Sequence, residues 1–193
     1  MTEKNGEKII TDLHNIISEE FKNADYEDGC LRFFEENDNA SGKFVKFKTK
    51  GKYIAFSLEQ KEKGEKKVFP FFNKSKEEIN SKNDGIIIFL KDGKLCIFLL
   101  EIKSALSTKT KEKALSQLRK GKIFVEFLFG IYKDVEKISE LKYEIREGIF
   151  CTDERKSATK RTSVRKIDID KISNVKFFIE KANNIYELTR FFI

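Results

Sequence analysis

The chain has 193 residues, of which 39% are hydrophobic and 37% charged, so it is long enough to bury a core and must carry a densely ionic surface. One histidine and three widely spaced cysteines exclude a zinc site, and the lack of any uninterrupted apolar run of about 18 residues excludes a membrane-spanning helix. The net charge of +7 favours a polyanionic partner, although the same lysine excess is typical of an A/T-rich genome.

The N-terminal segment is acidic and lacks the apolar region of a secretory signal. No internal repeat and no long Gly/Pro/Ser linker divides the chain. We therefore expect one domain over residues 1–193, located in the cytoplasm, with reduced cysteines and no membrane contact.

In the N-terminal part, apolar spacing indicates one helix followed by strands. Residues recurring at helical spacing predict a helix over 6–22. The region 30–34 stays unassigned. Alternating apolar and polar residues predict strands over 44–48 and 53–58. The charged run 59–67 is typical of a hairpin tip or loop.

Two strongly apolar strands are predicted over 86–90 and 95–102. They flank Asp92-Gly93, a dipeptide that is a strong short-range signal for a hairpin turn. Both faces of these strands are apolar, so we expect them at the centre of a sheet that is covered on both sides.

After the hairpin, the sequence predicts a long helix over 110–132 and a strand over 145–151. A basic loop over 153–166, a short strand over 175–179 and a terminal helical segment follow. The order of helix, antiparallel strands, helix and strand indicates an α/β sandwich with a mixed central sheet.

The predicted hairpin brings chemically distinctive residues together at its open end. If Asp92-Gly93 is a two-residue turn, counting outward places Asp84 opposite Glu101, with Cβ atoms about 4.5–5.5 Å apart. Lys103 projects to the same face. A bulge would shift this register by one residue.

Two carboxylates at this separation repel each other unless a cation lies between them or one is protonated. A site with oxygen ligands and no His or Cys suits Mg²⁺ or Mn²⁺, which can activate water beside a phosphate. A nearby lysine can hold that water or neutralise charge on the phosphate. Because acid-x-Lys recurs elsewhere in this chain, a salt bridge at a strand end remains the alternative interpretation.

Asn83-Asp84-Gly85 followed by Glu101-Ile102-Lys103 resembles the signature of the PD-(D/E)XK nuclease superfamily, with Asn83 where the family name has proline. The resemblance implies a restriction-endonuclease-like α/β/α sandwich. It also implies that Asp84 and Glu101 ligate the metal, that the carbonyl of Ile102 adds a ligand, and that Lys103 assists the attacking water.

Two further residues are candidates for this centre. Glu20 lies on the apolar side of the predicted first helix, and many superfamily members carry a metal-binding acid there; a helix-end glutamate turned to solvent is the alternative. Gln117 lies one or two turns into the helix after the motif and resembles the glutamine that several families place there to hold the active site or the substrate phosphate, although a solvent-facing side chain is the more common role of a helical glutamine. His14 is interpreted as an exposed helix residue.

Basic residues gather after the motif and in the loop over 153–166, where a phosphate backbone could be bound or where they are simply solvated. The predicted nucleic-acid contacts are Lys109, Lys111, Lys113, Arg119, Lys120, Arg155, Lys156, Lys160 and Arg161.

Together these features predict a Mg²⁺-dependent (or Mn²⁺-dependent) nuclease, a DNA endonuclease of restriction, defence or repair type. DNA is favoured over RNA as its partner. Two alternatives stay open: an RNA-cleaving or junction-resolving nuclease of the same fold, and a catalytically inactive nuclease-like module that binds nucleic acid or protein. A homodimer is also left open.

Overall fold

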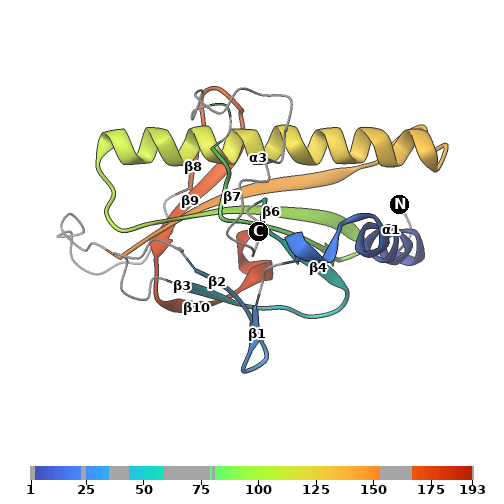
Figure 1. The fold of residues 1–193 in the computed structure, drawn as a ribbon, viewed down its shortest axis with the longest axis horizontal. Coiled ribbons are helices and arrows are strands. Elements are labelled where there is room, and N and C mark those ends of the chain that lie inside the picture. Colours follow the sequence, from blue (N-terminus) through green and yellow to red (C-terminus); the bar gives the residue numbers. More distant parts are fainter. Residues whose placement is uncertain are drawn as a thin grey trace.

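The computed structural model describes residues 3–22, 25–34, 44–58, 79, 81–152 and 167–192. In this part of the chain, a six-stranded sheet is covered by helices on one face and by a four-stranded sheet on the other (Figure 1). The helices are α1 (Glu3–Ile16) and α3 (Thr108–Val135), with short 3₁₀ turns η1 (Glu19–Phe21) and η2 (Leu188–Phe191). The strands are β1 (Asp25–Glu27), β2 (Cys30–Phe34), β3 (Phe44–Lys48), β4 (Tyr53–Phe56), β5 (Gly85–Lys91), β6 (Lys94–Lys103), β7 (Tyr143–Cys151), β8 (Ile167–Ile169), β9 (Lys176–Lys181) and β10 (Asn184–Glu187).

The larger sheet is mixed, with the strand order β4-β5-β6-β7-β9-β8. Strands β4, β5 and β6 are antiparallel neighbours, whereas β6, β7 and β9 run parallel. A parallel pair needs a long crossover connection, and α3 provides it between β6 and β7. The smaller sheet has the order β1-β2-β3-β10. The predicted mixed α/β architecture is therefore present.

The β5–β6 hairpin lies at the centre of the larger sheet, as its two apolar faces predict. Ile86 and Ile88 pack toward α1 and α3, whereas Ile87 and Phe89 pack toward the smaller sheet. Phe47 of β3 stands at the centre of that second layer, with its ring centroid 5.6 Å from that of Phe98. Both faces of the hairpin are thus removed from water, which stabilises its register.

The turn of this hairpin has the predicted form. Asp92 and Gly93 adopt φ values of 51° and 72°, the left-handed conformation of a two-residue hairpin turn. Lys91 pairs with Lys94, and the pairing continues without a bulge to Gly85 and Leu100. The register counted from the sequence is confirmed.

The layer opposite the helices differs from the predicted α/β/α sandwich, because it is a sheet. The unassigned region 30–34 is β2 and pairs with β3. The expected terminal helical segment instead forms β10 and η2: Asn183 turns the chain at φ 55°, and β10 then pairs in parallel with β3.

The first helix is shorter than predicted, since α1 ends at Ile16 instead of residue 22. Ser18 is extended, and the carbonyl of Phe21 in η1 accepts a 2.9 Å hydrogen bond from the amide of Ser57. The chain therefore leaves the helix to contact the end of β4. The predicted loops over 59–67 and 153–166 lie outside the described residues, and none of the described helices is long and apolar enough to cross a membrane.

Candidate active site

The open end of the β5–β6 hairpin brings Asp84 and Glu101 to one side of the sheet. Asp84 directly precedes β5, and the pairing of Gly85 with Leu100 makes Asp84 and Glu101 the next positions in register. By the alternation along each strand, both side chains lie on the face that packs against α3. The amide of Ile102 donates a 2.5 Å hydrogen bond to Asp84 Oδ2, which fixes this carboxylate against the end of β6.

Glu101 is a fully buried carboxyl group within a strand. Its Oε1 atom is in contact with the ammonium group of Lys103, whereas its buried Oε2 atom has no hydrogen-bond partner among the described residues. Burial raises the pKa of Glu101 well above that of an ordinary glutamate, the charge of Asp84 raises it further, and Lys103 opposes both effects. An additional cation beside Glu101 would therefore stabilise its ionised form.

The donor set at this position fits a hard divalent cation. Carboxylate oxygens are the ligands of Mg²⁺ and Mn²⁺, and the buried Oε2 of Glu101 is an oxygen for which the described residues offer no donor. Among the described residues, no three or more His, Cys, Asp or Glu side chains form a metal-binding group. Mg²⁺ commonly uses one or two carboxylates, with water and substrate phosphate completing its coordination, so Asp84 and Glu101 suffice as the protein ligands.

The main chain of Ile102 is oriented toward the same place. A strand residue points its N–H and C=O groups to the same side, and the N–H of Ile102 points to Asp84. Its carbonyl, the predicted third ligand, therefore lies on the side of Asp84.

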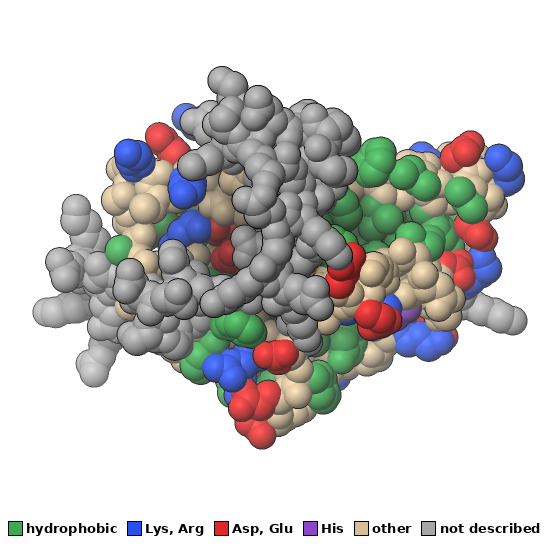
Figure 2. All heavy atoms as spheres, in the orientation of Figure 1, with side chains coloured by type: hydrophobic (Ala, Val, Ile, Leu, Met, Phe, Trp, Pro, Cys, Tyr) green, Lys and Arg blue, Asp and Glu red, His purple; other side chains and the backbone are tan. Residues whose placement is uncertain are grey.

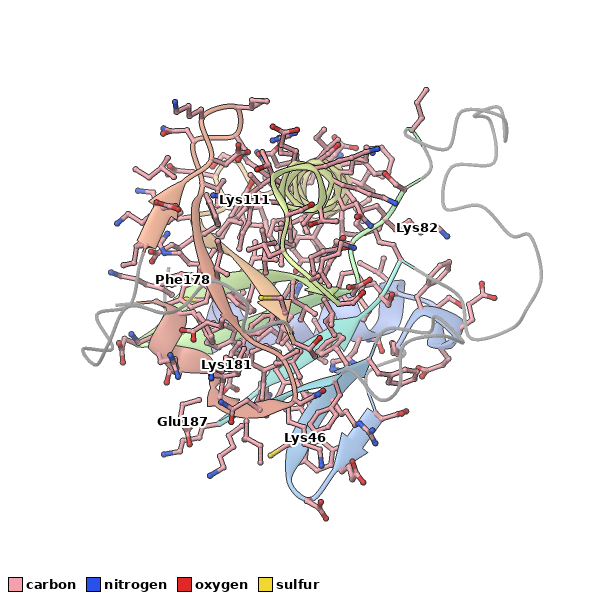
Figure 3. All side chains as sticks on the ribbon, turned by 90° about the vertical axis from the view of Figure 1, so that its left-hand side faces the viewer. Lys46, Lys82, Lys111, Phe178, Lys181 and Glu187 are labelled. Atoms are coloured by element: carbon pink, nitrogen blue, oxygen red, sulfur yellow. The ribbon has the colours of Figure 1, made fainter. Side chains whose placement is uncertain are left out.

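Helix α3 holds the segment that leads into Asp84. Gln117, which is 8% exposed, donates a 2.5 Å hydrogen bond to the carbonyl of Lys82, and Lys120 contacts the hydroxyl of Ser81. Figure 3 shows the segment carrying Lys82 beside α3, which is viewed nearly end-on. Gln117 thus contacts the backbone two residues before Asp84.

Asn83 and Gly121 form the closest part of this contact. Asn83 is fully buried and donates a 2.6 Å hydrogen bond to the carbonyl of Gly85. A Cβ atom at Gly121 would lie 2.5 Å from Asn83 Oδ1. Glycine at this position lets the helix approach the residue before Asp84. The sequence did not predict these roles of Asn83 and Gly121. Asn83 was noted only because it stands where the family signature has proline, and no pattern drew attention to Gly121.

The start of α3 is fixed by a capping box shortly after Lys103. Ser107 accepts a 3.2 Å hydrogen bond from the amide of Thr110, and the amide of Ser107 donates a 2.6 Å hydrogen bond to the hydroxyl of Thr110. These contacts satisfy donors at the helix end, so the chain can turn within four residues from the strand that carries Lys103 into α3.

Glu20 is not brought into this cluster. It lies in η1 with an exposed side chain, and it forms no metal-binding group with Asp84 and Glu101. The early end of α1 is the reason, because Glu20 no longer continues the buried side of that helix. Its role as a metal ligand stays a prediction. His14 is exposed, as expected, and its Nε2 atom lies 2.9 Å from the carbonyl of Tyr53.

The predicted phosphate-binding cations differ in their surroundings. Lys109 and Lys113 are exposed on the first turns of α3. Arg119 forms a 3.2 Å ion pair with the buried Asp170, and Lys111 lies 3.6 Å from Asp168 and 5.0 Å from the ring centroid of Phe177. Lys120 is engaged by Ser81. The remaining four, Arg155, Lys156, Lys160 and Arg161, lie outside the described residues.

A second buried acid, Glu147 of β7, was also missed. It is fully buried, and neither of its carboxyl oxygens has a hydrogen-bond partner among the described residues. Asp170, Lys122 and Arg119 lie close enough to influence its pKa. The period of two shared by Ile145, Glu147 and Ile149 is the signal that could have revealed an acid on an apolar strand face.

Acidic and basic side chains are seen next to each other below the N-terminal half of α3 (Figure 2).

No protein-family model, no curated protein and no solved structure matches this chain.

Proposed function

We propose that the chain is a metal-dependent nuclease that hydrolyses phosphodiester bonds at Asp84, Glu101 and Lys103. One observation carries the proposal: two carboxyl groups at the open end of the β5–β6 hairpin share one side of the sheet, and the buried one has an oxygen with no donor in the part of the chain that the structure describes. A salt bridge at a strand end would need only one acid. The charge of Asp84 makes it more costly to bury Glu101 in its ionised form. A divalent cation bound between the two carboxylates would offset this cost.

In this proposal Asp84 and Glu101 hold Mg²⁺ or Mn²⁺, with the Ile102 carbonyl as a third ligand. Such a cation supplies an activated water and offsets negative charge on the phosphate. Hydrolysis joins a water oxygen to phosphorus and breaks the bond to the leaving oxygen, which takes up a proton. Lys103 is placed to orient that water or to neutralise charge on the phosphate, because its ammonium group is in contact with Glu101.

The role of α3 is to position these groups. Gln117 donates a hydrogen bond to Lys82, and Gly121 allows close packing against Asn83. These contacts position Asp84 relative to β6. Exposed Lys109 and Lys113 on the same helix offer contacts to a phosphate backbone, which favours a nucleic acid over a small phosphodiester. DNA is the preferred substrate in this proposal, and RNA is the other arm of the test.

The test is cleavage of plasmid, linear duplex, single-stranded DNA and RNA with Mg²⁺, Mn²⁺ or EDTA. Asp84→Ala and Glu101→Ala should each lower the rate by at least about 100-fold, since each removes a ligand of the catalytic cation. Lys103→Ala should lower the rate by about 100-fold while Mn²⁺ binding is retained.

Glu140 and Lys142 provide the matched control, because they repeat the acid-x-Lys spacing on the surface, with side chains 71% and 75% exposed. Glu140→Ala and Lys142→Ala should leave cleavage unchanged. Full activity of folded Glu101→Ala protein, or tight binding of nucleic acid by the wild type with no cleavage under any metal condition, contradicts the proposal.

A further inference from the structure

The last residues of the three parallel strands form one row at an edge of the larger sheet, here named the strand-end row. β6 ends at Lys103, β7 at Cys151 and β9 at Lys181. Lys103 pairs with Cys151, and Cys151 pairs with Lys181, so the three side chains project from the same face of the sheet. By the alternation along each strand, this is the face of Glu101, which packs against α3.

Hydrogen bonds between the strand ends fix the backbone just beyond the row. The hydroxyl of Thr152 donates a 2.7 Å hydrogen bond to the carbonyl of Ser104, and the amide of Ala182 donates a 2.8 Å hydrogen bond to the carbonyl of Cys151. Adjacent strands lie about 4.8 Å apart, so the backbones of Lys103 and Lys181 are about 10 Å apart across the sheet. One ammonium group therefore belongs to the proposed centre, and the other is carried two strands away on a fixed scaffold.

Next to the two proposed metal ligands, the described strand ends carry only positive charge. The segments 103–109, 151–152 and 181–184 contain three lysines and no Asp or Glu. The acid that precedes Lys181 in β9, Glu180, projects from the opposite face and forms a 2.7 Å ion pair with Arg190. The strand ends therefore attract a polyanion on the face that carries the proposed centre.

The first turn of α3 adds to this charge. α3 begins at Thr108, at the same end of the molecule as the connection from β6 (Figure 1), and Figure 3 views this end with Lys181 below α3. A helix N-terminus carries about half a unit of positive charge, and acids are the residues usually favoured there. The first turn of α3 has no acid and carries the exposed Lys109 instead. This choice does not stabilise the helix, which indicates that it serves an anion outside it.

We propose that the strand-end row is a phosphate-binding track, in which Lys181 binds the nucleic-acid backbone on one side of the phosphate that is cleaved at Asp84, Glu101 and Lys103. This inference rests on the proposed function and adds Lys181 to it as a substrate-binding residue. Phosphates follow each other about every 3.4 Å along each strand of B-form DNA, so a separation of about 10 Å places Lys181 about three phosphates from the cleaved bond. Ligands of open α/β sheets bind outside the carboxyl ends of the parallel strands, which is where the row lies.

The first measurement is the binding of a short labelled DNA duplex by the full chain in EDTA, which removes the proposed catalytic cation, over about 50–200 mM salt. Lys181→Ala should raise Kd at least about five-fold and lower the slope of log Kd against log salt by about one, because one phosphate contact is lost. Lys181→Arg keeps the charge and should bind like the wild type. Lys176→Ala is the matched control and should also bind like the wild type, because Lys176 is exposed at the opposite end of β9.

Wild-type affinity and salt slope in Lys181→Ala, an equal loss in Lys176→Ala, or a wild type without salt-dependent binding overturns the track. If the wild type cleaves DNA while Lys181→Ala binds it normally, the track is wrong and the proposed function stands. If the wild type binds without cleaving and only Lys181→Ala binds more weakly, the proposed function is wrong and the phosphate contact of Lys181 stands.

The second measurement adds a charge in the middle of the row. Cys151→Glu and Cys151→Gln place side chains of the same size between Lys103 and Lys181 and differ by one negative charge, so any loss of packing is common to both. Cys151→Glu should bind the duplex at least about five-fold more weakly than Cys151→Gln, because its carboxylate competes with phosphate for both ammonium groups. Equal dissociation constants for the two folded variants would also overturn the proposal.

Discussion

Glu147 is a buried carboxyl group in β7 with no hydrogen-bond donor among the described residues. Its pKa is raised to about 8, mainly by burial and also by the charge of Asp170, while Lys122 and Arg119 act in the opposite direction. At neutral pH the folded protein therefore holds a proton here that an ordinary glutamate would have released. A protonated carboxyl group is the less costly form in this position.

This residue should make stability fall as the pH rises. Between the ordinary value of 4.5 and about 8, the folded state binds more protons at Glu147 than the unfolded chain does. The free energy of unfolding should therefore drop across this window, by at most about 1.4 kcal/mol per pH unit. Glu147→Gln cannot ionise, so it should gain stability relative to the wild type between pH 5 and pH 9 in urea unfolding.

Glu140→Gln is the control for the change of charge, because Glu140 is exposed and should follow the wild-type pH profile. Glu101 also has a raised pKa, and it contributes equally to both proteins, so the difference between the two profiles reports Glu147. Parallel profiles of Glu147→Gln and wild type would mean that Glu147 is ionised in the folded protein.

The contact between α3 and residues 81–83 links helix packing to the candidate active site. An alanine Cβ at Gly121 would meet Asn83 Oδ1 at 2.5 Å, so the buried Asn83 side chain, its segment or the helix must move. Gly121→Ala should cost about 1–3 kcal/mol of unfolding free energy and should lower cleavage, because Asp84 follows Asn83. Gly130 on the same helix has nothing within 4 Å of an added Cβ, so Gly130→Ala should keep activity and keep or raise stability by up to about 1 kcal/mol. Equal unfolding free energies for the two variants would contradict this role of Gly121.

Elements defined by short-range signals were predictable from the sequence, whereas those defined by distant partners were not. The β5–β6 hairpin follows from Asp92-Gly93 between apolar runs, and its register placed Asp84 opposite Glu101. By contrast, β10 exists because it pairs with β3 from the opposite end of the chain, and β8 pairs only at the sheet edge. After α1 ends, the carbonyl of Phe21 accepts a hydrogen bond from the amide of Ser57, a contact with a distant residue that local periodicity does not encode.

At the scale of the whole molecule, the apolar residues of the central hairpin indicated that both of its faces are covered. They did not indicate which elements cover them. The strands predicted over 44–48 and 53–58 are consecutive in the chain, yet the strands that form there, β3 and β4, belong to different sheets. The sequence predicted that Asp84, Glu101 and Lys103 share one face of the sheet, because side chains alternate between the two faces along a strand. The contacts of Asn83 with Gly121 were not, since they require α3 to cross back over the sheet.

The most direct test of the proposed centre is to locate Mn²⁺ in crystals of the protein by its anomalous signal. We expect a manganese ion bound by carboxylate oxygens of both Asp84 and Glu101, at about 2.0–2.2 Å from each, with the Ile102 carbonyl turned toward it. Crystals of Glu101→Ala soaked in the same way should lack this ion, whereas those of Glu140→Ala should retain it. A wild-type crystal saturated with Mn²⁺ that shows no ion between Asp84 and Glu101 would contradict the account.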